Sequence, residues 1–181
     1  MGQLVATDWQ VITGDCAAVM ATFEPDSIDL TVTSPPYDNL RKYNGYTFDF
    51  EAIAAQLWRV TKPGGVVVWV VADATINGSE TGTSFRQALH FMGLGFRLHD
   101  TMIYSTNKPP LNHNRYERQF EYTFVLSKGQ VITFNPIMIP CDHAGGKQSP
   151  TFRHNGAGLH KMHKLNPIKG TKIKGNIWHY K

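Results

Sequence analysis

The chain has 181 residues, 41% hydrophobic side chains and a formal net charge of +4. This length suffices for one domain with a sizeable core and is short for two. The composition excludes a disordered chain, and no apolar run approaches the roughly 20 residues that a membrane-spanning helix needs. Without a signal peptide or a disulfide framework (Cys16 and Cys141 lie far apart), we expect a cytoplasmic protein.

The charge is unevenly distributed. Residues 1–106 hold 6 Lys and Arg against 11 Asp and Glu, whereas residues 107–181 hold 12 against 3. The basic second part favours contact with a polyanion such as nucleic acid, with a solvated basic tail as the alternative. Because its basic residues are spread among Gly, Pro, His and Asn, the pattern suits phosphate-contacting loops.

The chain opens with a predicted strand, helix and strand. Residues 10–12 are predicted as a short strand, and residues 16–23 as a helix with Asp15 at its N-cap. After a turn, residues 28–33 form an apolar strand. These elements predict an α/β fold.

The tetrapeptide Ser34-Pro35-Pro36-Tyr37 stops this strand abruptly. Proline fixes φ, biases its predecessor towards extended geometry and has no N–H. A hydroxyl, a carbonyl and an aromatic ring therefore project from the carboxyl end of a strand, where ligands bind in open α/β sheets. An ordinary Pro-rich loop is the alternative, and the preceding strand favours a site.

Such a trio suits a planar exocyclic amine. The hydroxyl of Ser34 and the carbonyl of Pro35 accept its two hydrogens, while the ring of Tyr37 stacks on the attached heterocycle. Accepting these hydrogens favours a pyramidal nitrogen with a directed lone pair, so that catalysis on such an amine consists of positioning and electrostatic support.

The remaining elements complete the predicted sheet. Helices are predicted over residues 49–60 and from residue 83 or 84 to 92, and strands over residues 66–71, 97–105 and 119–127, with a polar loop at 76–82. The segment Lys62-Pro63-Gly64-Gly65 is expected to end the first helix. Asp73, just after strand 66–71, is expected at the same sheet edge as Ser34.

The tetrapeptide in this setting resembles the motif Ser/Asp/Asn-Pro-Pro-Tyr/Phe of the amino-methylating (N4-cytosine or N6-adenine) DNA methyltransferases. The similarity spans residues 9–129, including residues 11–16, residues 29–37 and Lys62-Pro63-Gly64-Gly65. It is closest to the permuted beta group, in which the catalytic half precedes the cofactor half. The resemblance implies a Rossmann-like, S-adenosylmethionine-dependent methyltransferase sheet, circularly permuted and incomplete.

The resemblance implies S-adenosylmethionine as cofactor, bound by Asp15, Cys16, Ser34 and Asp73. For Asp15, helix capping is an equal and compatible alternative. The family's Phe-x-Gly-x-Gly segment is missing, and Gly156-Ala157-Gly158 is no substitute because no apolar strand precedes it. The C-terminal cofactor half is therefore expected to be absent, as in a fragment, a split enzyme or a decayed relative, and we expect weak cofactor binding by this chain alone.

Two domains are expected, a catalytic half over residues 1–129 and an irregular, basic target-recognition region over residues 130–181. Because a paired base has to be flipped out of double-stranded DNA, the loop at residues 38–46 is interpreted as closing over it, with an ordinary surface loop as the alternative. The expected DNA-binding residues are Arg41, Lys42, Tyr43, Tyr46, Lys108, Arg115 and Arg118.

Two other chemistries are disfavoured. Carbon methylation needs a cysteine after proline, but Pro140-Cys141 lies outside the catalytic half. The spacing of Cys141 and the nearby histidines His143, His154, His160 and His163 matches no ordinary zinc pattern, so no metal is expected.

The sequence thus predicts a site-specific DNA methyltransferase of the restriction-modification type. Serine at the first motif position favours cytosine N4 within the family, and adenine N6 stays open. A catalytically inactive DNA-binding fragment is the alternative from another class. A protein glutamine methyltransferase fits the basic tail poorly. A partner chain that supplies the missing segment and a homodimer are both left open.

Overall fold

The computed structural model describes residues 9–36, 48–106, 116–146, 152–154, 159–161 and 169–179. The chain divides into two compact units, one formed by Met1–Thr133 with Asn176–Lys181 and the other by Phe134–Gly175. The expected division after residue 129 differs from this at the C-terminal side, where the last residues return to the first unit. Among the described helices, none is long and apolar enough to cross a membrane.

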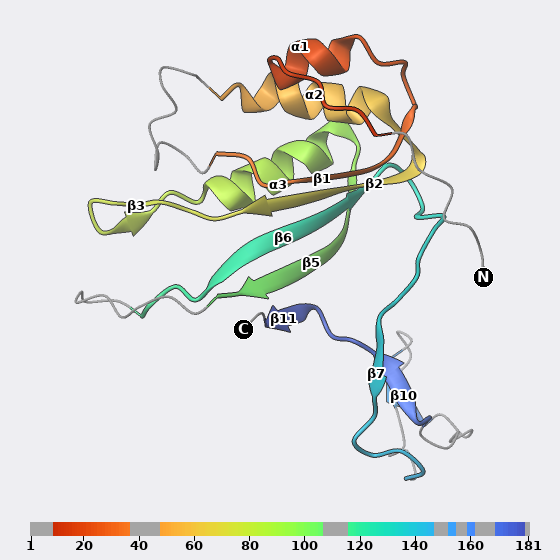
Figure 1. Ribbon diagram of the computed structural model, residues 1–181. Coiled ribbons are helices and arrows are strands. Elements are labelled where there is room, and N and C mark those ends of the chain that lie inside the picture. Colours follow the sequence, from red (N-terminus) through yellow and green to blue (C-terminus); the bar gives the residue numbers. More distant parts are fainter. Residues whose placement is uncertain are drawn as a thin grey trace. The chain divides into compact units, whose positions relative to one another are not determined.

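The first unit contains a five-stranded sheet (Figure 1). In spatial order its strands are β1 (Ile28–Thr33), β2 (Thr61–Val71), β6 (Phe120–Ser127), β5 (Arg97–Ser105) and β11 (Ile177–His179). The pairs β1–β2 and β5–β11 are parallel, whereas β6 runs antiparallel to both of its neighbours. The carboxyl ends of β1, β2 and β5 therefore meet at one end of the sheet, together with the start of β6. We call this the carboxyl end.

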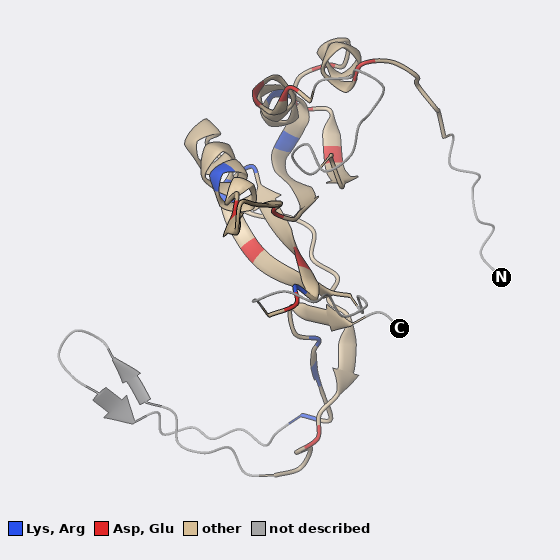
Figure 2. Ribbon diagram, turned by 90° about the vertical axis from the view of Figure 1, so that its left-hand side faces the viewer, with Lys and Arg blue, Asp and Glu red and all other residues tan. Residues whose placement is uncertain are grey.

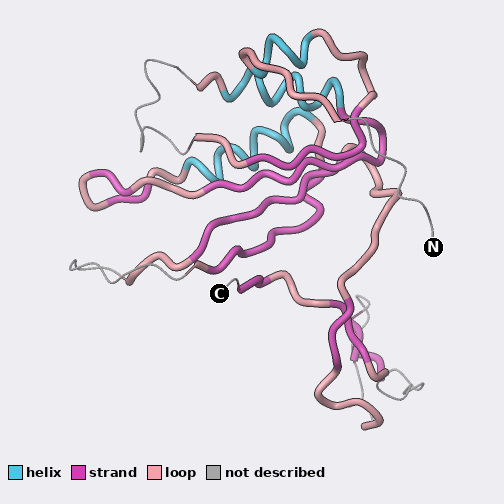
Figure 3. Tube along the Cα trace, in the orientation of Figure 1, coloured by secondary structure: helices cyan, strands magenta, loops and turns pink. Residues whose placement is uncertain are grey.

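Three helices, α1 (Cys16–Ala21), α2 (Phe50–Val60) and α3 (Thr83–Leu94), lie along one face of the sheet (Figures 1 and 3). Beneath them the core is built around Trp69, Phe91 and Leu126, all essentially buried. The rings of Trp69 and Phe91 meet edge to face at 5.0 Å, and the Trp69 indole donates to Gln87 at 2.8 Å. The expected α/β fold is confirmed.

The opposite face carries no helix in the described part of the chain. The strand register puts Leu30 beside Val66 and Val32 beside Val68, on the side away from Trp69. We call this side the open face. By the register it carries Leu30, Val32, Val66, Val68, Val70, Thr123, Val125 and Ser127, and further along the sheet also Asp100, Met102, Tyr104 and Glu121. The run of valines in β2 predicts burial on both sides, but only alternate residues, such as Val67 and Val71, are fully buried.

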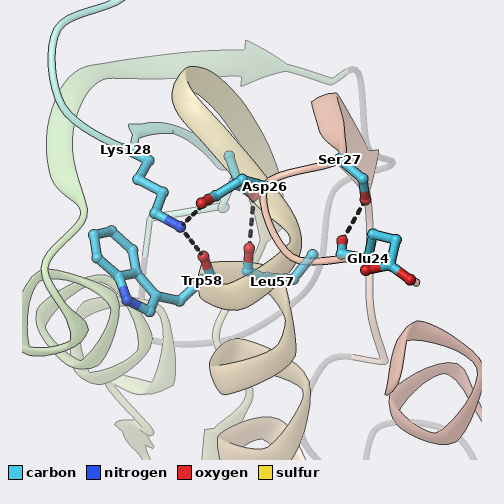
Figure 4. Close-up of polar contacts among 7 residues, drawn as sticks. Glu24, Asp26, Ser27, Leu57, Trp58 and Lys128 are labelled. Carbon is cyan, nitrogen blue, oxygen red and sulfur yellow. Dashed lines mark hydrogen bonds and ion pairs between the residues drawn. The ribbon is translucent and has the colours of Figure 1, made fainter. Parts of the chain in front are cut away.

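At the other end of the sheet, which we call the anchored end, polar contacts tie the turns together (Figure 4). Lys128 donates to the Asp26 carboxylate at 2.6 Å and to the Trp58 carbonyl at 2.8 Å, and its ammonium lies 4.7 Å from the Trp58 ring centroid. Arg59 donates to the carbonyls of Met20 and Phe23 at 2.6 and 2.9 Å, which satisfies the last turn of α1.

The segment Lys62-Pro63-Gly64-Gly65 lies within β2, not between a helix and a strand as predicted. The pairing of β1 with β2 shifts between Ile28 and Leu30, so the segment forms a bulge. Pro63 cannot donate to a ladder, and Gly64 has a φ of +83° with Ile132 packed where a Cβ would be.

Three smaller predictions were wrong. Residues 10–12 form no strand, because no described segment pairs with them. The helix predicted to end at residue 92 continues to Leu94, and Gly95, a glycine expected to help stop it, ends it with a φ of +113°. The expected loop at 76–82 contains the hairpin β3 (Thr75–Ile76) and β4 (Ser79–Glu80). Its Asn77-Gly78 turn, with both φ positive, is a strong hairpin signal in the sequence itself.

The second unit, Phe134–Gly175, contains two short antiparallel pairs. They are β7 (Met138–Pro140) with β10 (Thr171–Ile173), and β8 (Phe152–His154) with β9 (Leu159–Lys161). The unit holds seven Lys and Arg against one Asp. Asp142, the acid of this unit, pairs with Lys172 at 3.4 Å. Figure 2 colours Lys and Arg blue and Asp and Glu red.

Candidate active site

The tetrapeptide begins directly after β1, at the carboxyl end. Ser34 is exposed, Pro35 is buried and Pro36 is half-buried. The ring of the buried Pro35 fixes the backbone there. It therefore holds the backbone of Ser34 in place, while Ser34 itself stays exposed to solvent. Ser34 is therefore accessible to a ligand, as the predicted role of its hydroxyl requires. Tyr37 lies outside the described residues, and the direction of the Pro35 carbonyl stays a prediction.

The strand register brings several other chain segments to the same end. Thr33 lies opposite Trp69, Val71 lies opposite Tyr122, and Ser105 lies opposite Phe120. The chain therefore passes this end of the sheet after β1, after β2, after β5 and before β6. This is the arrangement in which open α/β sheets bind ligands, and the prediction that Asp73 and Ser34 share one sheet end is consistent with it.

Asp73 lies two residues beyond β2 and is 4% exposed. Its carboxylate accepts from the Ser84 N–H at 2.9 Å, the Ser84 hydroxyl at 2.5 Å and the Thr81 hydroxyl at 3.3 Å. Since Ser84 is in the first turn of α3, these bonds cap that helix from a neighbouring strand. Asp73 is thus a positioning residue in the observed geometry, and its contact with a cofactor stays a prediction.

Arg118 approaches the same end from the segment before β6. One terminal nitrogen of its guanidinium donates to the Asp73 carbonyl. Its Nε, like the hydroxyl of Thr106, is buried without a hydrogen-bond partner among the described residues. The predicted DNA contact of Arg118 is untested, whereas its observed role is to link the end of β2 to the start of β6.

Tyr122 is the titratable group whose pKa is shifted at this end. Burial raises its pKa above the ordinary value of 10.0, and the negative charges of Asp73 and Glu80 raise it further. Its hydroxyl therefore stays protonated throughout the neutral range. The ring stacks on Phe124 at 5.5 Å and meets Phe85 edge to face at 5.3 Å, so Tyr122 joins the core to the site.

Asp15 caps α1, as the sequence predicts, by accepting from the Ala18 N–H at 2.9 Å. Cys16 follows it and is exposed with a free thiol. Their expected contact with a cofactor stays a prediction. Among the described residues, no group of three or more His, Cys, Asp or Glu side chains is arranged to hold a metal ion.

Six of the seven predicted DNA-binding residues lie outside the described residues: Arg41, Lys42, Tyr43, Tyr46, Lys108 and Arg115. The segments to which they belong leave from Pro36 and from Thr106, which both follow strands that finish at the carboxyl end. Sequence reasoning missed the capping of α3 by Asp73 and the part played by Tyr122, because both depend on strand register.

Comparisons with known proteins agree with this geometry. The family model described as DNA methylase (N6_N4_Mtase) matches residues 28–180, which is most of the chain. The chain belongs to this family. The resemblance stated from the sequence is thereby confirmed, and the tetrapeptide lies within the matched region.

Two curated relatives differ in how much of their length this chain covers. The chain is 51% identical over 156 residues to the orphan methyltransferase M.BamHII of Bacillus amyloliquefaciens. This match covers 84% of this chain and 59% of M.BamHII. The chain is 26% identical over 127 residues to the type II beta methyltransferase M.BslI of Bacillus sp. (strain NEB-606), covering 61% of this chain and 14% of M.BslI. The chain thus spans less than two thirds of either relative.

Solved structures share the fold. TTHA0409 of Thermus thermophilus, described as a DNA modification methylase and solved with S-adenosyl-L-methionine, matches with a TM-score of 0.54 at 25% identity, over 67% of this chain and 56% of that one. The PvuII DNA methyltransferase, described as cytosine-N4-specific, matches with a TM-score of 0.54 at 20% identity, over 65% of this chain and 48% of that one. The latter similarity concerns the fold alone.

Proposed function

We propose that this chain carries the base-binding catalytic part of a DNA methyltransferase that acts on an exocyclic amine, with cytosine N4 favoured over adenine N6. The observation that carries the proposal is Ser34, exposed at the carboxyl end and fixed there by the buried Pro35. Membership of the DNA methylase family and the similarity to a protein solved with S-adenosyl-L-methionine support it. Serine at the first motif position is the reason for favouring cytosine.

In this mechanism the chain supplies hydrogen-bond acceptors and S-adenosylmethionine, when bound, supplies the methyl group. Ser34 Oγ and the Pro35 carbonyl accept the two N–H groups of a base flipped out of the duplex, and Tyr37 stacks on its ring. These bonds favour a pyramidal nitrogen and stabilise the positive charge that develops on it. Asp73, which caps α3, ties the end of the neighbouring strand β2 to the start of that helix.

Ser34→Ala tests the proposal. It is expected to lower methylation by at least about 100-fold, in line with the loss of one preorganised hydrogen bond to developing charge, while DNA binding stays intact. Ser79→Ala, at the exposed serine of the β3–β4 hairpin, is the matched control and should be neutral. Mass spectrometry of nucleosides from DNA exposed to each variant distinguishes N4-methylcytosine from N6-methyladenine. Intact protein that binds DNA without methylating it would favour the inactive DNA-binding module.

Because the chain spans 59% of M.BamHII, we also propose that it binds S-adenosylmethionine weakly by itself. Calorimetric titration of the isolated chain should give an affinity weaker than micromolar. Micromolar affinity would contradict this part of the proposal without affecting the role of Ser34.

A further inference from the structure

The second unit holds a single acid, Asp142, among seven Lys and Arg residues. Asp142 lies just after β7, in a turn that the Ala144 N–H closes by donating to the Cys141 carbonyl at 3.2 Å. Its side chain is 81% exposed, and its carboxylate lies 3.4 Å from the Lys172 ammonium on β10. Because a surface ion pair of this kind contributes little to stability, folding gives little reason for an acid at this position.

The charge of the unit indicates what the acid faces. An excess of basic side chains favours the phosphates of DNA, and those phosphates repel a carboxylate on the same surface. A carboxylate is favourable there only where it accepts a hydrogen bond from the DNA. The donors that the bases display in the major groove are the amines of cytosine N4 and adenine N6. An exposed acid in a basic, DNA-facing unit therefore indicates contact with a base.

The strands next to Asp142 have a shape that fits a groove. β7 and β10 form a two-stranded antiparallel ribbon, and the bond from the Cys141 N–H to the Gly170 carbonyl at 3.0 Å extends its ladder towards the turn of Asp142. Met138 and Ile173, which pair across the ribbon, are 50% and 55% exposed. The major groove of B-DNA is wide enough for a two-stranded ribbon, whereas the minor groove is about half as wide.

A carboxylate beside an ammonium complements the edge of a C·G base pair. In that pair the donor at cytosine N4 lies one hydrogen-bond length from the acceptor at guanine O6, and guanine N7 is a second acceptor. The 3.4 Å between the charged atoms of Asp142 and Lys172 is close to this spacing. A T·A pair fits less well, because adenine puts its N7 acceptor near the carboxylate and thymine puts a methyl group near the ammonium.

We propose that Asp142 and Lys172 together read one C·G base pair in the major groove. Asp142 accepts from cytosine N4, and Lys172 donates to guanine O6 and N7. Because the base to be methylated leaves the duplex, the pair that they read is another pair of the recognition sequence. The inference rests on the proposed function in taking duplex DNA as substrate, but it needs neither the cofactor nor Ser34.

Selection from duplexes of randomised sequence tests this inference by sequencing the DNA that the chain binds. The wild type is expected to select a site with a fixed C·G pair. Asp142→Asn is expected to lower the preference for C·G at that one position by at least about tenfold, because an amide complements adenine instead. Lys172→Met should lower the preference at the same position. The double variant should lose little more than either single variant, since both side chains contact the same base pair.

Asp29→Asn is the matched control. Asp29 is 80% exposed and pairs with Lys62 at 2.7 Å in the first unit, so its change should leave the selected site as it is. An unchanged C·G preference in Asp142→Asn, or a gain of affinity that is equal for all sequences, would overturn the inference, as would a wild type that selects no sequence. Ser34→Ala separates the inference from the proposed function, because this variant should select the wild-type site without methylating it.

Discussion

The two ends of the sheet are built differently. At the anchored end, the turns are closed by the bonds of Lys128 to Asp26 and Trp58 (Figure 4) and by those of Arg59 to the carbonyls of Met20 and Phe23. At the carboxyl end, Ser34 is exposed, and Asp73 provides the main observed attachment. The contacts at the anchored end, which has no role in the proposed chemistry, tie its turns directly to one another, whereas those of Asp73 hold β2 to α3 and leave Ser34 exposed.

Loss of the Asp73 carboxylate should lower the free energy of unfolding more than any of the other changes below. Asp73→Ala leaves the Ser84 N–H and hydroxyl buried without their acceptor, so we expect a destabilisation of about 3 kcal/mol. Asp49→Ala is the matched control, because Asp49 caps α2 through a single exposed bond to Ala52, and should cost about 1 kcal/mol. Urea unfolding measures both. If Asp73→Ala lost cofactor affinity at unchanged stability, Asp73 would be a ligand residue and not a positioning residue.

The glycines at the anchored end should be the next most sensitive positions. Gly95 and Gly129 both have positive φ, but a Cβ on Gly95 would lie 2.9 Å from the Trp58 ring, whereas one on Gly129 would meet nothing within 4 Å. We expect Gly129→Ala to cost about 1 kcal/mol and Gly95→Ala about 2 kcal/mol, measured by thermal unfolding. Equal costs would mean that backbone strain alone matters there.

Lys128→Met removes the central cation of the anchored end. We expect a loss of about 1.5 kcal/mol, reduced by the half-exposure of Asp26, without a change in methylation per folded molecule. Lys62→Met, which breaks a solvent-exposed pair with Asp29, should cost less than about 0.5 kcal/mol. A large drop in specific activity for Lys128→Met would show that the two ends are coupled.

The smallest expected effect is the contribution of Tyr122, at the carboxyl end, to the pH dependence of the free energy of unfolding. Its raised pKa means that the folded protein keeps the phenol proton to higher pH than the unfolded chain. The resulting stability is present below pH 10 and is lost as the pH rises through the folded-state pKa. Urea unfolding at pH 9 and pH 11 should therefore show a steeper loss in the wild type than in Tyr122→Phe. Identical slopes would place Tyr122 in a solvent-like environment.

Many elements of this protein could be predicted from short stretches of its sequence. The helix Phe50–Val60 follows from its apolar spacing and from Asp49, and Asp15 caps α1 as expected. The Ser34 tetrapeptide could be recognised because two prolines restrict the backbone whatever surrounds them. Signals of this kind act over a few residues, which is why the sequence by itself determined the main elements, the family and the serine at the candidate site.

The features that only the tertiary structure decided depend on which segments of the chain pack against one another. Residues 10–12 have strand-like composition but no described strand beside them, and Val66, Val68 and Val70 have the composition of a strand buried on both faces but are covered on one. Asp73 was expected at the sheet edge of Ser34, but its bonds to Ser84 at the start of α3 depend on how β2 and α3 pack, which the sequence did not indicate. Backbone pairing and burial are properties of two surfaces in contact, so one surface alone could not predict them.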